Sequence, residues 1–506
     1  MIQHILSAIV FLPLVGAAFV LFVPREDKRL HKYIALMTCL ITFVLSCVLV
    51  ARFDASNTGM QFLENHEWIS SLRISYLLGV DGLSVTLIPL TALLFLLCII
   101  ASWDRTSGLK GYFSLFLMLE TAMLGTFAAQ DLFLLFAFWE AALLPIYFMI
   151  GVWGGKNCEY ASTKFFLYQL AGSALLMLGM ILVYYVAEPH SFSLLDLAGG
   201  KFGESRIEIG DRSLRVEPIV FLLMLAGFAV RLPVVPLHSW FPHVQAEAPA
   251  ALAVILAAVF IKTGAYALVR VNYSLFPSAA NWLASSLAIA GAVNIIYGGI
   301  CALGQRDIRR LGAYSCISHM GFVLLGLGIF SSTSFHGAIL QMVAHGVYAG
   351  LLFFLIGILG MRSGKYMITN EDGSPGYGGL ILKAPLLTGF FTVAVFSAMG
   401  VPGLGAFPSE SLVFIGAFPS HRTLTVIGLV GVFLTAGYFL WMYRRMFLGN
   451  PSDVSNRVTD VTVREQIFLI PLILLCVFVG TYPTPLINLA QPTVNQVLTA
   501  LGKEIK

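Results

Sequence analysis

The stretch 253–271, AVILAAVFIKTGAYALVRV, places Lys262 inside an apolar run that is long enough to cross most of a lipid bilayer. A bilayer core about 30 Å thick needs roughly 20 apolar residues in a helix. The rest of the chain has the same character, because 58% of its 506 residues are hydrophobic and only 11% are charged. Soluble proteins carry roughly a quarter charged residues. We therefore predict an integral membrane protein.

Apolar runs of spanning length recur along the whole chain. Alternation with a period of two residues is absent, and backbone groups in lipid must be paired internally, so we expect helices rather than a β-barrel. The prediction is an all-α polytopic membrane protein forming a single membrane domain over residues 1–506, with no cleavable signal peptide. Its fourteen candidate spans are residues 3–23, 33–51, 77–101, 112–129, 132–151, 165–187, 218–237, 250–269, 281–301, 311–329, 336–360, 384–402, 424–443 and 466–490.

The positive charges are distributed unevenly between the connections. Of 30 Lys and Arg residues, 18 fall in the odd-numbered connections and 10 in the even ones and the C-terminal tail. Cytoplasmic loops carry the excess of Lys and Arg, so both termini are predicted on the non-cytoplasmic side. The net charge of +4 reflects this bias and gives no reason to expect nucleic acid. The seven scattered cysteines include no CxxC pair, so neither a metal nor an iron–sulfur site is expected.

Two predicted spans are interrupted by Pro and Gly, at RLPVVPLHSWFPHVQAEAP (231–249) and MGVPGLGAFPSES (399–411). The offset between them is close to the offset between the fourth and ninth spans. This indicates two five-helix repeats, 112–270 and 281–445, with helices 7 and 12 broken at equivalent places. Paired broken helices point to a transport site near the membrane midplane. The alternative is that membrane helices simply contain more Pro and Gly.

Ionisable residues inside or beside these spans are the candidate site. An uncompensated charge at a helix centre costs about 3 kcal/mol on insertion scales, so each of these residues needs a partner or water. For each, the alternative is a structural role, such as a core ion pair, a protonated carboxyl or an interfacial charge. The candidates are Glu120, Glu140, Arg231, His238, Lys262, His319, His345 and Glu410.

Each candidate has an expected role. Arginine does not deprotonate in proteins, so Arg231 is expected to act as a fixed counter-ion of Glu140. Burial disfavours a charged amine, so Lys262 can accept and release a proton, and Tyr266 one turn later is expected to hydrogen-bond it. The histidines suit proton relay, and Glu410 would be the last carboxylate before bulk water. Together they predict a string parallel to the membrane that moves protons or small cations.

Several of these segments resemble the antiporter-like subunits of respiratory complex I, the NADH:quinone oxidoreductase, and are most similar to its chain M family. The resemblance implies fourteen helices, with the two five-helix repeats inverted, and a proton channel. It assigns Glu140, Lys262 and Glu410 to that channel, with His319 and His345 on the connecting polar axis. The matching stretches, within residues 77–445, include GVDGLSVTLIPLTALL, FLMLETAMLGTFAAQDLFLLFAFWEAALLPIYFMIGVWG, ASTKFFLYQLAGSALLML, LPVVPLHSWFPHVQAEAP, LGAYSCISHMGFVLLGL and QMVAHGVYAGLLFFLIG.

The resemblance further implies a proton-translocating subunit of the bacterial inner membrane, driven by redox chemistry in partner chains. NADH, FMN, quinone and iron–sulfur clusters would lie in those partners, and this chain would hold no cofactor. Its contacts would be neighbouring membrane subunits, lipid and protons. The chain departs from the family pattern at Arg231, where a lysine is usual, and at Val244 and Gln245, where Ala-His is usual. Two alternatives stay open: a cation/proton antiporter subunit of the multisubunit Na⁺/H⁺ type or a related hydrogenase assembly, and a non-transporting scaffold.

Overall fold

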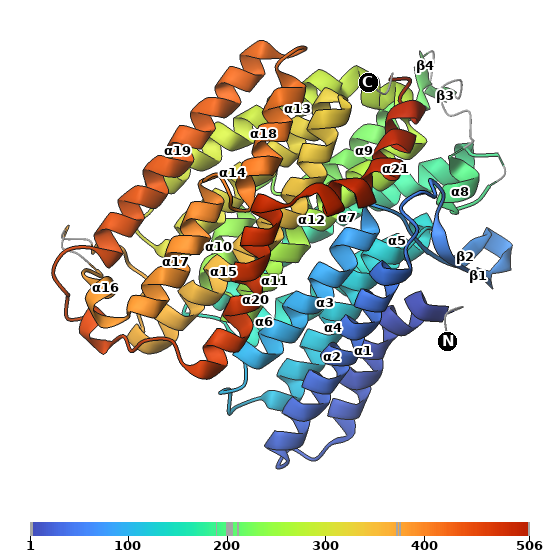
Figure 1. The fold of residues 1–506 in the computed structure, drawn as a ribbon. Helices are drawn as coiled ribbons and strands as arrows, with labels where there is room; N and C mark the ends of the chain where they lie inside the picture. The colour runs from blue at the N-terminus through green and yellow to red at the C-terminus, as the bar shows by residue number, and fades with distance from the viewer. Residues whose placement is uncertain are drawn as a thin grey trace.

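The computed structural model is a bundle of long helices that run roughly side by side (Figure 1). It describes residues 4–188, 190–198, 206–209, 212–370, 373 and 376–503. Within these residues, 12 helices are long and apolar enough to cross a membrane, so the predicted helical membrane fold is confirmed while the count of fourteen stays a prediction. The spanning helices include α1 (Ile5–Phe22), α2 (Lys28–Arg52), α3 (Ser84–Ala101), α4 (Leu109–Ala128), α7 (Cys158–Val186), α13 (Pro277–Leu303), α14 (Ile308–Ile329), α15 (Ser332–Ser363), α19 (Arg422–Phe447) and α20 (Val463–Thr481).

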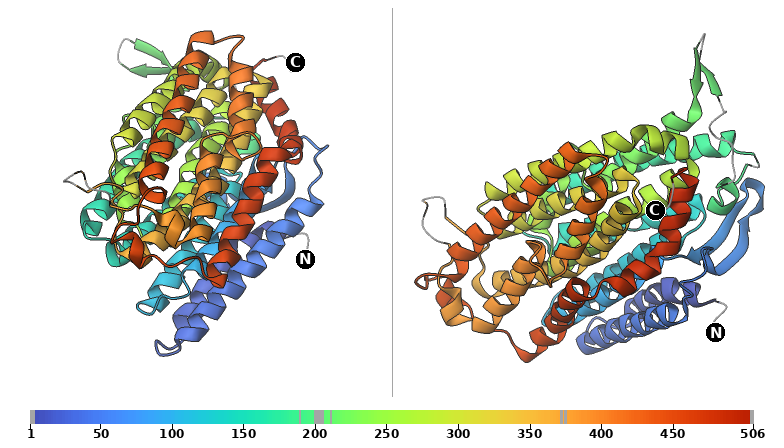
Figure 2. Two further views of the ribbon diagram at one scale, coloured as in Figure 1. Left: turned by 60° about the vertical axis from the view of Figure 1, so that its left-hand side comes forward. Right: turned by 45° about the horizontal axis from the view of Figure 1, so that its top comes forward.

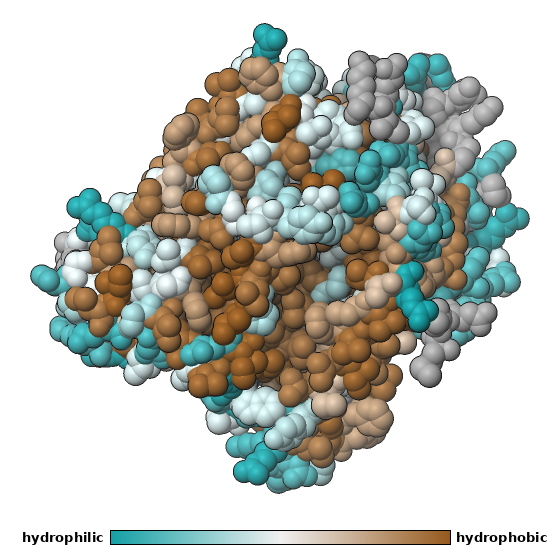
Figure 3. Space-filling model, viewed as in Figure 1, coloured by the Kyte–Doolittle hydropathy of each residue, from teal (hydrophilic) through white to brown (hydrophobic). Residues whose placement is uncertain are grey.

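The outer helices and the central helices differ in what surrounds them. In α1, α2, α19 and α20 less than half of the most apolar window is buried, so most of their apolar side chains face outward, as lipid contact requires. In α15 the whole window is buried. Figure 3 shows a broad apolar surface over one face of the bundle, with hydrophilic residues gathered toward the ends of the helices. The two further views in Figure 2 show the same elongated bundle.

Two predicted spans have wrong boundaries. The expected start at residue 77 falls inside strand β2 (Ile74–Val80), which pairs antiparallel with β1 (Gln61–Ile69) in a hairpin outside the bundle (Figures 1 and 2). The expected span 466–490 is interrupted, since α20 ends at Thr481 and α21 (Thr484–Ala500) follows with Pro at its start. Proline lacks the N–H that a continuing helix needs, which explains the break. A second short hairpin joins β3 (Arg206–Ile209) and β4 (Arg212–Arg215).

Both predicted interruptions are real breaks in helices. Helix α9 (Val216–Arg231) is separated from α10 (Trp240–Glu247) by a non-helical segment that contains His238. Helix α17 (Pro385–Ala398) is separated from α18 (Ala406–Ala417) by a segment in which Gly400 and Gly403 have positive φ angles. Glycine adopts that conformation without steric cost. Broken helices 7 and 12 are therefore confirmed, whereas the inverted relation of the repeats 112–270 and 281–445 stays a prediction.

The helix that carries Lys262 is distorted on either side of it. In order, it consists of α11 (Ala250–Ile255), the π-helical segment η4 (Leu256–Phe260), α12 (Ile261–Ala267) and the π-helical segment η5 (Leu268–Tyr273). Every residue of its apolar window is buried, so it forms the centre of the bundle. Pi-helical turns inside α-helices are rare and frequent at functional sites. The remaining short helices are α5 (Leu132–Ala141), α6 (Leu143–Trp153), α8 (Leu194–Leu197) and α16 (Leu380–Lys383).

Candidate functional site

The Lys262 side chain is buried and has two polar contacts. Its Nζ donates to the backbone oxygen of Ala257 at 2.7 Å and lies 2.8 Å from Nδ1 of His345 on α15. The π-helical turn explains the first contact. The N–H of Ile261 donates to the oxygen of Leu256, five residues back, which leaves the Ala257 oxygen without its usual donor. The distortion therefore creates an acceptor for the lysine inside the membrane core.

Two histidines continue the path away from the lysine. The ring of His345 lies 5.6 Å, centroid to centroid, from the ring of His319 on α14, and the ring of Tyr348 lies 5.2–5.3 Å from both. Nδ1 of His319 then lies 3.3 Å from Oε1 of Glu410 on α18. Four residues that are far apart in the sequence, on four different helices, thus form one continuous string: Lys262, His345, His319 and Glu410.

Neutral polar groups support the Glu410 end of the string. The hydroxyl of Ser409 donates to Oε1 of Gln341 at 2.5 Å, and Nε2 of Gln341 donates to the hydroxyl of Tyr348 at 3.1 Å. These bonds connect α18 to α15 beside the two imidazole rings. Glu410 itself is buried. Its neighbour Gly400 shows why the broken helix matters, since a Cβ there would lie 3.2 Å from Oε2 of Glu410.

Arg231 does not contact Glu140, contrary to expectation. Its guanidinium stacks on the ring of Trp139 at 3.5 Å and lies 4.6 Å from the ring of Phe260. It donates to the backbone oxygen of Trp139 at 3.0 Å and to the side chain of Gln169 at 3.4 Å. Sequence spacing alone could not show this, because the aromatic rings come from α5 and η4. Glu140 is partly exposed and follows Trp139 directly, and no ion pair joins it to Arg231 among the described residues.

Two predicted site residues lie apart from the string. The buried Glu120 accepts a hydrogen bond from the thiol of Cys39 on α2 at 3.1 Å, and its other oxygen has no hydrogen-bond partner within the described part of the chain. His238, in the break between α9 and α10, packs its ring 4.9 Å from Tyr297 and 6.4 Å from Tyr314. Neither residue contacts Lys262, His345, His319 or Glu410 through the hydrogen bonds and ion pairs of the described residues.

The structure contains a buried ion pair that was not predicted from the sequence. Arg270 and Asp81 lie 2.5 Å apart and are almost fully buried. Asp81 also accepts from the N–H groups of Leu83 and Ser84. Nε of Arg270 donates to the hydroxyl of Tyr266 at 3.2 Å.

The predicted span 250–269 ends one residue before Arg270, and this boundary was wrong, because the helix continues to Tyr273. The signal was available, since Lys262, Tyr266 and Arg270 recur every four residues and so share one helix face. Tyr266 does not bond Lys262 either. Its hydroxyl donates to the backbone oxygen of Phe127 at 2.8 Å.

The geometry suits proton movement and not metal binding. No group of three or more His, Cys, Asp or Glu side chains that could hold a metal ion occurs among the described residues. Along the string, an amine is followed by two imidazoles and a carboxyl, and each of these groups can accept and release a proton. The fold and this site define a class: polytopic membrane proteins with an axis of buried ionisable groups across the bundle.

Comparisons with known proteins identify the family within that class. Residues 129–435 match the family described as "NADH:quinone oxidoreductase/Mrp antiporter, TM". The chain is 37% identical over 504 residues to NADH-quinone oxidoreductase subunit M of Rhodobacter capsulatus, covering 98% of this chain and 96% of the relative. The chain therefore belongs to this family, and the resemblance to antiporter-like complex I subunits is confirmed.

Solved structures agree with the assignment. A chain of respiratory complex I from Thermus thermophilus matches with a TM-score of 0.87 and 26% identity, over 99% of this chain and 100% of that one. A chain of the Mrp complex from Dietzia sp. DQ12-45-1b matches with a TM-score of 0.85 and 18% identity, over 99% of both chains. At that identity the second match concerns the fold alone.

Proposed function

We propose that this chain is a proton-translocating membrane subunit of an NADH:quinone oxidoreductase. The single observation that carries the proposal is the string Lys262–His345–His319–Glu410, in which consecutive groups lie within direct contact or one ring spacing. Such a string has no structural use that a set of apolar residues could not serve better, because each buried charge is costly. Family membership and the likeness to complex I support the same function.

The contacts define how a proton would move. A charged Lys262 donates to Nδ1 of His345, which must then hold its own proton on Nε2. Transfer from Nζ to Nδ1 leaves a neutral amine and a doubly protonated imidazole. That imidazole can release its Nε2 proton toward His319, by ring rotation or through one water molecule. His319 passes a proton on to Glu410, whose carboxylate accepts it at the 3.3 Å contact.

Arg231 lies outside the Lys262–Glu410 string and provides a fixed positive charge. A guanidinium keeps its proton, so this position is a permanent cation held between two aromatic rings. It does not take part in proton transfer itself. Phe260, which touches the guanidinium, lies two residues before Lys262 on the same distorted helix. Arg231 therefore contacts the helix that carries Lys262.

Redox work would come from elsewhere in the assembly. NADH, FMN, quinone and iron–sulfur clusters would bind to partner subunits, and this chain would contribute translocation alone. We place it in a bacterial inner membrane as a multi-pass protein, beside other antiporter-like membrane subunits. The charge bias of the connections places both termini on the non-cytoplasmic side.

The test is Lys262→Ala in the assembled complex, with Lys156→Ala in an exposed connection as the matched control. NADH oxidation and proton uptake are measured together in inverted membrane vesicles. We expect the lysine variant to lose most proton uptake per NADH oxidised, while the control matches the wild type. Wild-type proton uptake in Lys262→Ala would show that the string does not carry protons.

The alternative is a cation/proton antiporter subunit, which the fold of the Mrp complex allows. The site argues against it, since sodium prefers oxygen ligands, whereas three of the four groups in the string present nitrogen. Vesicles without NADH decide between the two, because sodium-driven proton flux in them would favour the antiporter.

A further inference from the structure

We propose that the chain binds the headgroup of an anionic phospholipid at one end of the bundle, in a basic hollow between the α1–α2 connection and the start of α4. The proposal is independent of the proton pathway and does not rest on it. The hollow has a volume of about 520 Å³ and three cationic lining residues, Arg25, Lys28 and Lys110. No carboxylate of the described residues lines it.

None of the three cations has an anionic partner among the described residues. In the described part of the chain, none of them forms an ion pair, and Lys110 makes only a bond of 3.2 Å to the backbone oxygen of Val23. Three unpaired cations around one cavity repel one another, so an anion there lowers the free energy of the folded protein. Basic pockets between spanning helices bind anionic lipid headgroups in this way.

Further donors surround the same hollow. Thr106, Gly108 and Trp153 also line it. Gly108 has a φ angle of +65° and a Cβ there would come within 2.8 Å of the indole Nε1 of Trp153, so glycine is needed for this close approach. The N-terminus of α4 lacks a side-chain cap and any acidic residue in its first turn, which adds a partial positive charge. Tryptophan at this level is typical of the membrane interface.

An apolar track leads from the hollow along the membrane-facing side of the bundle. Leu144, Phe148 and Val152 recur every four residues on α6 and are 54%, 46% and 64% exposed. The next residue, Trp153, lines the hollow. On the other side, Leu21 of α1 is half exposed and lines the hollow as well. An acyl chain attached to a headgroup in the basic hollow would lie on this track, which a free phosphate ion would not use.

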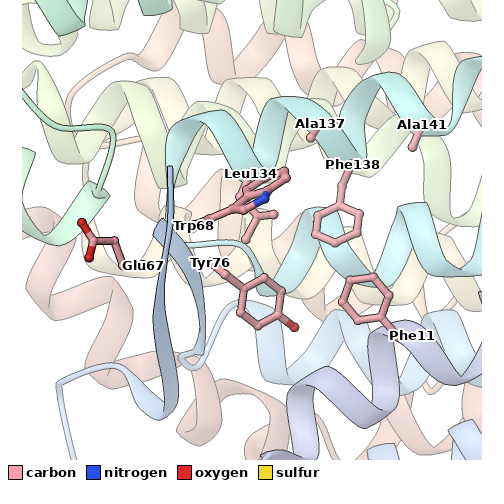
Figure 4. Close-up of a pocket in the computed structure, with 8 residues that line it drawn as sticks. All are labelled: Phe11, Glu67, Trp68, Tyr76, Leu134, Ala137, Phe138 and Ala141. Atoms are coloured by element: carbon pink, nitrogen blue, oxygen red, sulfur yellow. The ribbon is translucent and has the colours of Figure 1, made fainter. Parts of the chain in front are cut away.

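A second hollow, of about 520 Å³, lacks the basic character. Phe11 of α1 meets Phe138 of α5 beside it, with ring centroids 6.1 Å apart (Figure 4). Figure 4 shows both rings turned toward the hollow while the carboxylate of Glu67 points away from it. Within the part of the chain that the structure describes, no Lys or Arg lines this second hollow. Of these two hollows, only the one beside the α1–α2 connection therefore offers cations to an anionic headgroup.

The test uses the complex purified in mild detergent with its partner subunits. One variant combines Arg25→Gln, Lys28→Gln and Lys110→Gln, and the matched control combines Arg444→Gln, Arg445→Gln and Arg457→Gln at exposed positions. Phosphatidylglycerol and phosphatidylcholine are titrated back after delipidation, and bound lipid is counted by native mass spectrometry. A basic residue near an anionic headgroup contributes about fivefold in affinity, so we expect the first variant to bind phosphatidylglycerol roughly 100-fold more weakly. The control should bind it as the wild type does.

Several results would overturn the proposal. Equal phosphatidylglycerol binding in the first variant and the wild type would do so, as would an equal loss in both triple variants. Displacement of the lipid by millimolar inorganic phosphate would indicate a free-anion site. A benzophenone side chain at Val152 should capture phospholipid on illumination. Capture of a neighbouring subunit at Val152 would instead assign the apolar track to a helix of that subunit.

Discussion

The buried pair of Asp81 and Arg270 gives a prediction whose size follows from its geometry. The two groups lie 2.5 Å apart, and the side chains of Asp81 and Arg270 are 2% and 6% exposed, so water does not solvate either charge. Breaking a buried pair by removing one partner typically costs 3–5 kcal/mol, because the other charge is left uncompensated. Asp81→Asn tests this cleanly. Asparagine caps a helix as well as aspartate does, so the bonds to Leu83 and Ser84 can survive the change.

We expect Asp81→Asn to destabilise the chain by about 3–5 kcal/mol. The double variant Asp81→Asn/Arg270→Met should recover most of this, because replacing a buried pair with apolar groups is often neutral or stabilising. Unfolding is followed by tryptophan fluorescence during SDS titration in mixed micelles, with Arg270→Met completing the cycle. A loss below about 1 kcal/mol in Asp81→Asn would refute the reasoning, as would a double variant no more stable than Asp81→Asn.

Three further predictions concern single positions. Arg231→Lys keeps the cation but weakens a stack on Trp139 that is worth about 1–2 kcal/mol, so we expect lower stability in SDS titration and proton uptake above half of wild type; uptake as low as in Arg231→Met would contradict this. Glu120→Gln should retain proton uptake in vesicles, because that carboxyl lies off the string, and a complete loss would place it on the path. Asp104→Asn should cost at most about 1 kcal/mol at neutral pH, because the pair with Arg464 is solvent-exposed. The hydrogen bond from Arg464 holds the pKa of Asp104 below its ordinary value of 3.8, so this stabilisation is present above that pH and is lost as the pH falls further; a difference from wild type that grows in acid would contradict the assignment.

The candidate site was only partly predictable. Lys262, His319, His345 and Glu410 could be named from the sequence, because an ionisable residue in a long apolar run is costly and therefore functional by default. Their order of contact could not, since it depends on how α12, α14, α15 and α18 pack. The same cost of burying a charge made Glu120 a candidate. It is also buried, but it accepts a hydrogen bond from a cysteine thiol and lies apart from the string.

The remaining errors have the same cause, because a local sequence pattern does not reveal a contact between residues that are distant in the chain. Arg231 was expected to pair with Glu140 because opposite charges were sought, whereas aromatic rings from α5 and η4 hold it instead. The predicted span 250–269 stopped before Arg270 because hydropathy alone set its boundary. Its partner Asp81 lies 189 positions earlier in the chain, and no local pattern connects them.

The sequence by itself determined that this protein is a helical membrane bundle with two broken helices, because apolar length and Pro/Gly interruptions act within a single segment. It also determined which side chains bear a charge where charge is expensive. Only the tertiary structure decided which of those side chains touch, since residues 83 and 91 positions apart meet at the Lys262–His345 and His319–Glu410 ends of the string. The physical reason is that hydropathy sums along the chain, whereas a proton crosses only between atoms that packing has brought within about 3 Å.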